Sequence, residues 1–253
     1  MHRFFITPDQ LEGSRIRITG EDVNHIKNVL RMKPGEEIRI SDGTGWDYFC
    51  RIESIETEQV TAEIVREEQN TTELPSRIVL FQGLPKGDKM EWIIQKAVEL
   101  GVGEIVPVSC RRCVVKLDPK KEESKLRRWN TISESAAKQS KRLIVPRVMP
   151  VMTLKEAIAY GGSLDIRLIP YENENGMQNS GRLIKDCVPG KSIGILIGPE
   201  GGFDESEVEY ARACGWNPIS LGDRILRTET AGMMLLSVLM FRLETFETDN
   251  TGR

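Results

Sequence analysis

The sequence predicts an α/β protein in which a β-rich domain precedes a domain built on a mostly parallel sheet. Before residue 72, apolar residues alternate with a period of two in several short segments, which is typical of half-buried strands. After Arg77, apolar strands alternate with amphipathic helices, which is typical of a parallel sheet covered on both faces. The polar, turn-prone stretch 67–75 separates the two patterns and is a suitable linker. We therefore predict domains over residues 1–72 and 73–253.

The first domain is expected to contain short strands and one helix. Strands are expected at 15–20, 36–42, 46–52 and 60–65. The Asp-Gly-Thr-Gly turn at 42–45 predicts a hairpin between the second and third of them. Residues 21–32 place four apolar side chains on one face and end before Pro34, so a helix is expected there. Four short strands with one helix favour a small barrel.

The second domain is expected to contain five strands, at the apolar runs 78–83, 104–109, 164–169, 192–197 and 219–221. Helices are expected at 88–100, 125–140, 153–160, 204–214 and 229–244. Side chains suited to N-caps precede the last three of these helices: Thr153, Asp204, and Thr228 or Thr230. In open α/β sheets, ligands bind beyond the carboxyl ends of the strands. The loops after Ile169, Ile197 and Leu221 are therefore the candidate ligand loops.

Two of these loops have unusual compositions. The loop 198–203 reads Gly-Pro-Glu-Gly-Gly-Phe, and its glycines allow the main chain to approach a ligand closely. Its spacing is not that of the dinucleotide fingerprint, and Lys185 stands where a Walker A loop would need its first glycine. The loop 221–231 carries two arginines and a Thr-Glu-Thr entry into the last helix. The alternative for the first loop is a plain strand–helix turn, and the alternative for the second is a capped helix with solvated arginines.

Positive charge is concentrated in one part of an acidic chain. The net charge is −3, yet residues 111–147 hold twelve Lys or Arg against four Asp or Glu, which gives this segment +8. Such a segment indicates an anionic partner or, equally, a solvated helix face. Cys110 and Cys113 form a C-x-x-C without a second pair, so we predict ordinary thiols and no metal site. The apolar run 231–241 is too short to span a bilayer, and the N-terminus is unlike a signal peptide. We expect a cytoplasmic protein that does not contact a membrane.

The loops 198–203 and 221–231 resemble those of the bacterial 16S ribosomal RNA uridine-N3 methyltransferase family, within the trefoil-knotted SPOUT superfamily. Supporting matches lie at 3–5, His25, 29–31, 42–45, 86–102, 112–116, 137–142 and Pro146. The departures at Arg111, Cys113, Ser135 and Lys138 make this surface more basic. The resemblance implies a PUA-like RNA-binding barrel, a SPOUT-type α/β domain with a C-terminal trefoil knot, and a homodimer with each active site near the interface. It also implies methylation of uracil N3 in 16S ribosomal RNA or the small ribosomal subunit, with S-adenosyl-L-methionine as methyl donor.

Candidate roles for individual residues follow from the chemistry that this activity needs and from their placement in the chain. Arg227 is the candidate cation and Glu229 the candidate base for catalysis, although Glu229 can instead stabilise a helix N-terminus. The candidate cofactor contacts are Ile169, Glu172, Ile197, Gly198, Glu200, Gly201, Gly202, Leu221, Gly222, Ile225, Leu226, Thr230 and Ala231. The candidate RNA contacts are Arg3, His25, Arg31, Arg112, Lys116, Arg127, Arg128, Lys138, Lys141 and Arg142, with a packing role as the alternative for His25. Another SPOUT activity (a different base, 2′-O-ribose or transfer RNA) and a non-catalytic ribosome-assembly factor are the alternative functions.

Overall fold

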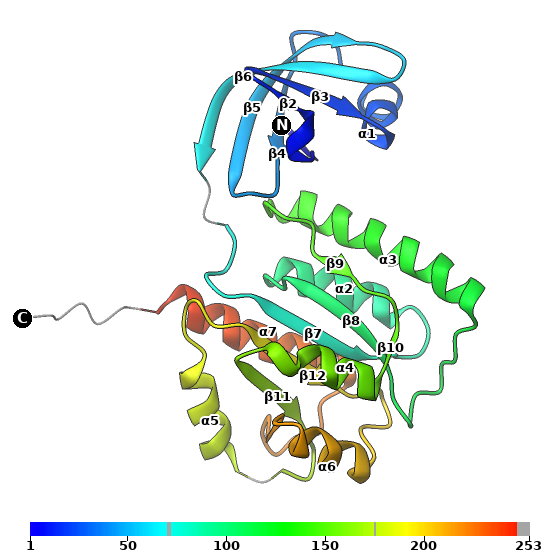
Figure 1. Ribbon diagram of the computed structural model, residues 1–253, viewed down its shortest axis with the longest axis vertical. Helices are drawn as coiled ribbons and strands as arrows, with labels where there is room; N and C mark the ends of the chain where they lie inside the picture. Colours follow the sequence, from blue (N-terminus) through cyan, green and yellow to red (C-terminus); the bar gives the residue numbers. More distant parts are fainter. Residues whose placement is uncertain (70–71, 175, 247–253) are drawn as a thin grey trace, which may run out of the picture. The chain divides into compact units, whose positions relative to one another are not determined.

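The computed structural model describes residues 1–69, 72–174 and 176–246, which form two compact units (Figure 1). The first unit contains Met1–Glu73 and Ala137–Val145, and the second contains Leu74–Ala136 and the chain from Pro146 onward. The segment 137–145, which the sequence assigned to the second domain, therefore packs with the first unit.

The first unit contains a six-stranded sheet. Its strands, in spatial order, are β1 (His2–Phe5), β4 (Glu37–Ser41), β5 (Trp46–Ile55), β6 (Gln59–Gln69), β3 (Arg15–Thr19) and β2 (Leu11–Glu12). β1 runs parallel to β4, and the other neighbours are antiparallel. The expected hairpin is confirmed as β4–β5, in which Ser41 pairs with Asp47. β6 continues to Gln69, so the first residues of the predicted linker, 67–75, belong to a paired strand.

The helix expected at 21–32 is shorter and changes character along its length. α1 (Glu21–Asn24) continues as a π-helical turn, η2 (His25–Val29), in which the Leu30 amide donates to the His25 carbonyl at 2.8 Å. Arg31 has φ +54°, a left-handed conformation that ends the helix. The predicted C-terminal end of this helix, at residue 32, is therefore wrong. Another short turn, η1 (Pro8–Gln10), follows β1.

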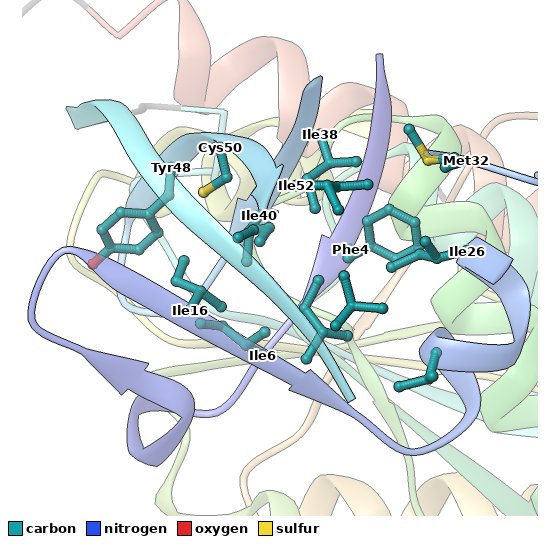
Figure 2. Packing of buried hydrophobic residues seen from close by; sticks show 14 residues of the cluster. Phe4, Ile6, Ile16, Ile26, Met32, Ile38, Ile40, Tyr48, Cys50 and Ile52 are labelled. Atoms are coloured by element: carbon teal, nitrogen blue, oxygen red, sulfur yellow. The ribbon is translucent and has the colours of Figure 1, made fainter. Parts of the chain in front are cut away.

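Alternating apolar residues form the core of the first unit. Ile16 and Ile18 of β3 are fully buried, whereas Arg15 and Arg17 on the same strand are exposed. Ile38 of β4 packs in the same cluster, which Figure 2 shows from close by. Because successive residues of a strand point to opposite faces, this alternation leaves the second face of the sheet for polar groups.

The second unit contains a seven-stranded sheet in which every paired strand is parallel. The order is β10 (Met152–Thr153), β8 (Glu104–Ser109), β7 (Ile78–Gly83), β12 (Ile193–Ile197), β11 (Ile166–Pro170) and β13 (Asn217–Ile219), and β9 (Arg147–Val148) also pairs with β8. All residues of β7 and β12 are buried, so both faces are covered, as predicted. β13 lies two residues earlier than expected, and beyond its end Ser220 exchanges hydrogen bonds with the Ser180 hydroxyl.

Within the described residues, six α-helices and one short turn accompany this sheet. They are α2 (Lys89–Glu99), α3 (Pro119–Gln139, whose end belongs to the first unit), α4 (Leu154–Tyr160), η3 (Gly161–Ser163), α5 (Met177–Asp186), α6 (Glu205–Ala213) and α7 (Thr228–Glu244). The caps at Thr153 and Asp204 are confirmed, since their side chains accept hydrogen bonds from the amides of Glu156 and Ser206. α5 was not predicted. None of the helices in the described ranges is long and apolar enough to cross a membrane.

Candidate active site

Three loops at the carboxyl ends of neighbouring strands enclose one cavity in the second unit. The loops follow β11, β12 and β13, which are adjacent in the sheet, and the cavity has a volume of about 610 Å³. Protein pockets that bind small molecules usually have volumes of this order. Among the predicted cofactor contacts, those that line the cavity are Glu172, Ile197, Gly198, Glu200, Gly202, Leu221, Gly222, Ile225, Leu226 and Ala231.

Three predicted cofactor contacts lie outside this lining. Ile169 is fully buried in β11, where its side chain belongs to the core. Gly201 faces Arg112, and a Cβ atom at this glycine would lie 3.2 Å from Arg112 Cβ. Thr230 is exposed in the first turn of α7. The sequence pattern located the loops but did not resolve which of their residues face inward.

The loop after β12 is compact and depends on glycine at two positions. Its main chain lies against the end of β7, where a Cβ atom on Gly83 would come within 2.6 Å of Pro199 N. Gly202 has φ +66°, which favours glycine, and its amide donates to the Pro199 carbonyl at 2.9 Å. A Cβ atom on Gly202 would also lie 3.1 Å from a carboxylate oxygen of Glu172. Glycine at these positions therefore lets the main chain of the loop approach the cavity closely.

A buried hydrogen-bond chain joins this loop to the loop after β13. The Gln82 amide Nε2 donates to Thr228 Oγ1 at 2.9 Å, and Thr228 Oγ1 donates to the Gly198 carbonyl at 2.6 Å. The predicted side-chain cap by Thr228 or Thr230 is wrong, because the N-cap residue of α7 is Arg227 and makes no side-chain capping bond. The Thr228 hydroxyl is instead used to connect two walls of the cavity.

Replacing Thr228 with valine should lower the free energy of unfolding by about 1–3 kcal/mol, because Gln82 and Gly198 each lose a buried partner. Ligand affinity at the cavity should fall as well, since the two walls are no longer joined. Replacement with serine keeps the hydroxyl and should leave both quantities close to those of the unchanged protein. Chemical denaturation and calorimetry measure the two effects, and equal behaviour of the valine and serine variants would contradict this role.

Charged side chains converge at the rim of the cavity. Lys89, which the sequence did not suggest, lines it, and its Nζ lies 3.0 Å from Glu200 Oε1 and 3.4 Å from Glu229 Oε2. The hydrogen bond with Glu200 raises the pKa of Lys89. Burial opposes ionisation of Glu200, but hydrogen bonds from the Lys86 amide and from Lys89 outweigh it, so the pKa of Glu200 lies below its usual range.

The two candidate catalytic residues occupy different positions. Arg227 is exposed and lines the cavity at the start of α7. Glu229 is half-buried in the first turn of α7, and its carboxylate contacts Lys89 rather than forming part of the cavity wall. An anion is favoured near a helix N-terminus, so Glu229 also suits its helix electrostatically.

The predicted RNA contacts of the first unit fall into two groups. Arg142 is only 3% exposed and pairs with Glu73, and Arg3 is buried against Asp47 while donating to the Arg142 carbonyl at 2.6 Å. We therefore reassign Arg3 and Arg142 from RNA contact to a packing role, because little of either side chain can reach a phosphate. Lys138 is partly buried, pairs with Asp22 at 3.0 Å and lies over the Phe4 ring. His25, Arg31 and Lys141 are exposed.

In the second unit, the predicted RNA contacts remain at the surface. Arg112, Lys116, Arg127 and Arg128 are exposed. Arg112 donates to the Gly201 carbonyl at 3.1 Å, so it also braces the loop after β12. Arg128 pairs with Glu91 at 2.7 Å, and Arg127 lies 3.7 Å from Glu123. Cys110 and Cys113 are buried free thiols, and in the described ranges no group of three or more His, Cys, Asp or Glu is arranged to hold a metal.

The fold and the three-loop cavity define the class of protein. The family model described as an RNA methyltransferase domain matches residues 72–240, and the one described as an RNA methyltransferase PUA domain matches residues 18–65. The first of these matches includes all three loops of the cavity. The chain thus has the domains of an RNA methyltransferase.

Individual relatives identify the family to which this RNA methyltransferase chain belongs. Ribosomal RNA small subunit methyltransferase E of Bacillus subtilis is 39% identical over 98% of this chain and 100% of the relative. The structure of the protein of the same name from Neisseria gonorrhoeae, bound to S-adenosylmethionine, is 35% identical with a TM-score of 0.83, over 95% of this chain and 97% of that one. A Legionella pneumophila methyltransferase structure, also with bound S-adenosylmethionine, is 31% identical with a TM-score of 0.82, over 94% and 96%. This chain belongs to the ribosomal RNA small subunit methyltransferase E family.

Proposed function

We propose that this protein methylates N3 of a uracil in 16S ribosomal RNA of the small ribosomal subunit, with S-adenosyl-L-methionine as the methyl donor. The observation that carries the proposal is the single cavity formed by three loops, in a chain whose family includes a structure with bound S-adenosylmethionine. Enzyme activity and the cofactor follow from the family. The choice of uracil N3 rests on the resemblance of the two loops to the uridine-N3 methyltransferases.

The cavity fits the cofactor in size and in chemistry. Gly198 and Gly202 present main-chain groups to it, Leu226 and Ala231 supply apolar walls, and Glu172 supplies a polar contact. When bound, S-adenosylmethionine supplies an activated methyl group on a sulfonium, so the protein needs only to position and polarise the acceptor. The loops after β12 and β13 hold the cofactor chiefly through their backbone.

Uracil N3 carries a proton at neutral pH and is a poor nucleophile until that proton leaves. Arg227 is the cation that stabilises the negative charge developing on the uracil ring, because it is exposed at the cavity. Glu229 is the group that accepts the proton, in the first turn of α7 and within ionic contact of the cavity-lining Lys89. The target base is flipped out or already unpaired when it reaches these groups.

The resemblance extends to features beyond the activity. The six-stranded sheet of the first unit is a PUA-like barrel that binds RNA, and the second unit is a SPOUT-type domain with a C-terminal trefoil knot. The protein works as a homodimer in the cytoplasm. Support for the homodimer comes from α7, where Val238 and Phe241 are exposed apolar residues that a second subunit would cover.

Mass mapping of 16S ribosomal RNA from a deletion strain tests the proposal. One uracil should lose an N3-methyl group and regain it when the gene is restored. Loss of a 2′-O-methyl group, of a different base methylation or of a transfer RNA methylation would favour another SPOUT activity. Calorimetry with S-adenosylmethionine separates the remaining alternative, because a non-catalytic assembly factor with a vestigial pocket would not bind it.

RNA affinity should fall steeply as salt concentration rises, because phosphate contacts release counterions. Replacing the exposed Lys116 or Arg127 with alanine should weaken binding to small subunits and lower the slope of log affinity against log salt by about one. Lys191, which is exposed outside the basic segment, is the matched control. Binding that hardly changes with salt would contradict the assignment of these residues.

A further inference from the structure

Lys89 occupies a position that is unfavourable for its own helix. It is the first residue of α2, where the partial positive charge of the helix N-terminus disfavours a cation. The preceding residue, Asp88, makes no side-chain capping bond that would offset this cost. Residues that go against a local structural preference of this kind are usually found at functional sites. The contacts of the Lys89 ammonium group indicate its function.

The ammonium group of Lys89 lies between two carboxylates from separate elements. Glu200 comes from the loop after β12 and Glu229 from the first turn of α7. Glu200 Oε1 has a second partner, because it also accepts a hydrogen bond from the Lys86 amide at 3.0 Å. Glu229 Oε2 is buried from solvent and makes no hydrogen bond within the described part of the chain, so its ionic contact with Lys89 is the interaction that offsets its burial.

We propose that Lys89 is a positioning residue for methyl transfer, whose ammonium group holds the Glu229 carboxylate in place beside the cavity. This inference rests on the proposed function, in which Glu229 accepts the uracil proton. Because Glu229 Oε2 makes no hydrogen bond within the described residues, loss of the ammonium group would release the carboxylate from the geometry that proton transfer requires.

The charged surroundings of Glu229 are few enough for a clear test. Lys89 approaches it from α2, Glu200 bonds the same ammonium group from the loop after β12, and Arg227 precedes it on the chain. Arg242, whose side chain donates a hydrogen bond to the Lys185 carbonyl of α5, lies near the other end of α7. Removing the charge of Lys89 therefore leaves Glu200 and Glu229 without the cation that they share.

The experiment measures kcat and KM for Lys89→Met on small subunits that lack the methyl group. Because a misplaced base slows the chemical step more than it weakens substrate binding, kcat should fall by about 10–100-fold while KM for the subunit stays within a few-fold. Lys89→Arg keeps the charge and should recover most of kcat. Lys96→Met is the matched control, because Lys96 lies on the same helix with a similar exposure, 35% against 34%, and pairs with Glu99.

A double-mutant cycle with Glu229→Gln shows whether Lys89 acts through Glu229. If it does, the double variant should be no slower than Glu229→Gln alone. Calorimetry with S-adenosylmethionine and thermal denaturation show that the cavity still forms. An unchanged kcat for Lys89→Met, or full additivity of the two substitutions, would overturn the inference while leaving the proposed function intact. Absence of methylation by the unchanged protein would instead overturn the proposed function.

Discussion

Replacing Arg227 with alanine should lower kcat for methyl transfer by about 10²–10³-fold and leave S-adenosylmethionine affinity within a few-fold. The reason is that a cation at the cavity stabilises charge that develops on uracil only during the reaction, so its loss affects the transition state more than the bound ground state. The deficit should narrow as pH rises, because a uracil that has already lost its N3 proton needs less help. Initial rates across a pH series measure both effects.

Two further variants serve as controls for the Arg227→Ala result. Lysine at this position keeps the charge without the planar guanidinium and should recover part of the rate. Alanine at Arg182, an exposed arginine of α5 outside the cavity, controls for the loss of a surface charge. If Arg227→Ala folds normally and methylates at the original rate, Arg227 is not the catalytic cation.

Replacing Asp47 with alanine should lower the free energy of unfolding of the first unit by about 3–5 kcal/mol. Asp47 is 0% exposed, and its Oδ2 accepts hydrogen bonds from Arg3 Nη2 at 2.9 Å and Arg39 Nε at 3.0 Å. Without this carboxylate, the buried guanidinium of Arg3 loses its charge partner, which costs far more than losing a pair on the surface. Hydrogen exchange in β4 and β5 measures the stability of this unit separately.

The exposed pair of Arg15 and Glu53 provides the matched control for Asp47. Both residues of this pair are exposed at the surface, so Glu53→Ala should cost less than about 1 kcal/mol. An Asp47→Ala variant with hydrogen exchange as slow as that of the Glu53→Ala variant would show that the buried ion pairs contribute little to stability.

Local sequence patterns predicted much of the fold because they reflect local physics. The wholly apolar runs of β7 and β12 indicated a covered parallel sheet, and Asp204 and Thr153 indicated helix starts through their capping chemistry. The three cavity loops could be located for the same reason, since each follows an apolar strand. α5 was missed because its sequence is largely polar and contains Gly181, which weakens the helical signal.

Contacts between distant parts of the chain could not be predicted in this way. Arg142 looked like a surface cation in a basic segment, yet its partner Glu73 lies 69 residues away. Lys89 looked like an ordinary helix residue, and only the fold brings Glu200 and Glu229 to its side chain. Periodicity and composition report on neighbours in sequence, whereas the burial or pairing of a charge depends on neighbours in space.

The grouping of residues 137–145 with the first unit has a consequence for biosynthesis. Ser41 Oγ donates to the Leu143 carbonyl at 2.8 Å, and Glu73 receives the Arg142 guanidinium, so this unit uses chain that is translated long after its own strands. A nascent polypeptide that has emerged only as far as residue 73 lacks these partners. The N-terminal region therefore reaches its final packing only after the ribosome has released residue 145, and a truncated gene product ending near residue 73 would remain incomplete.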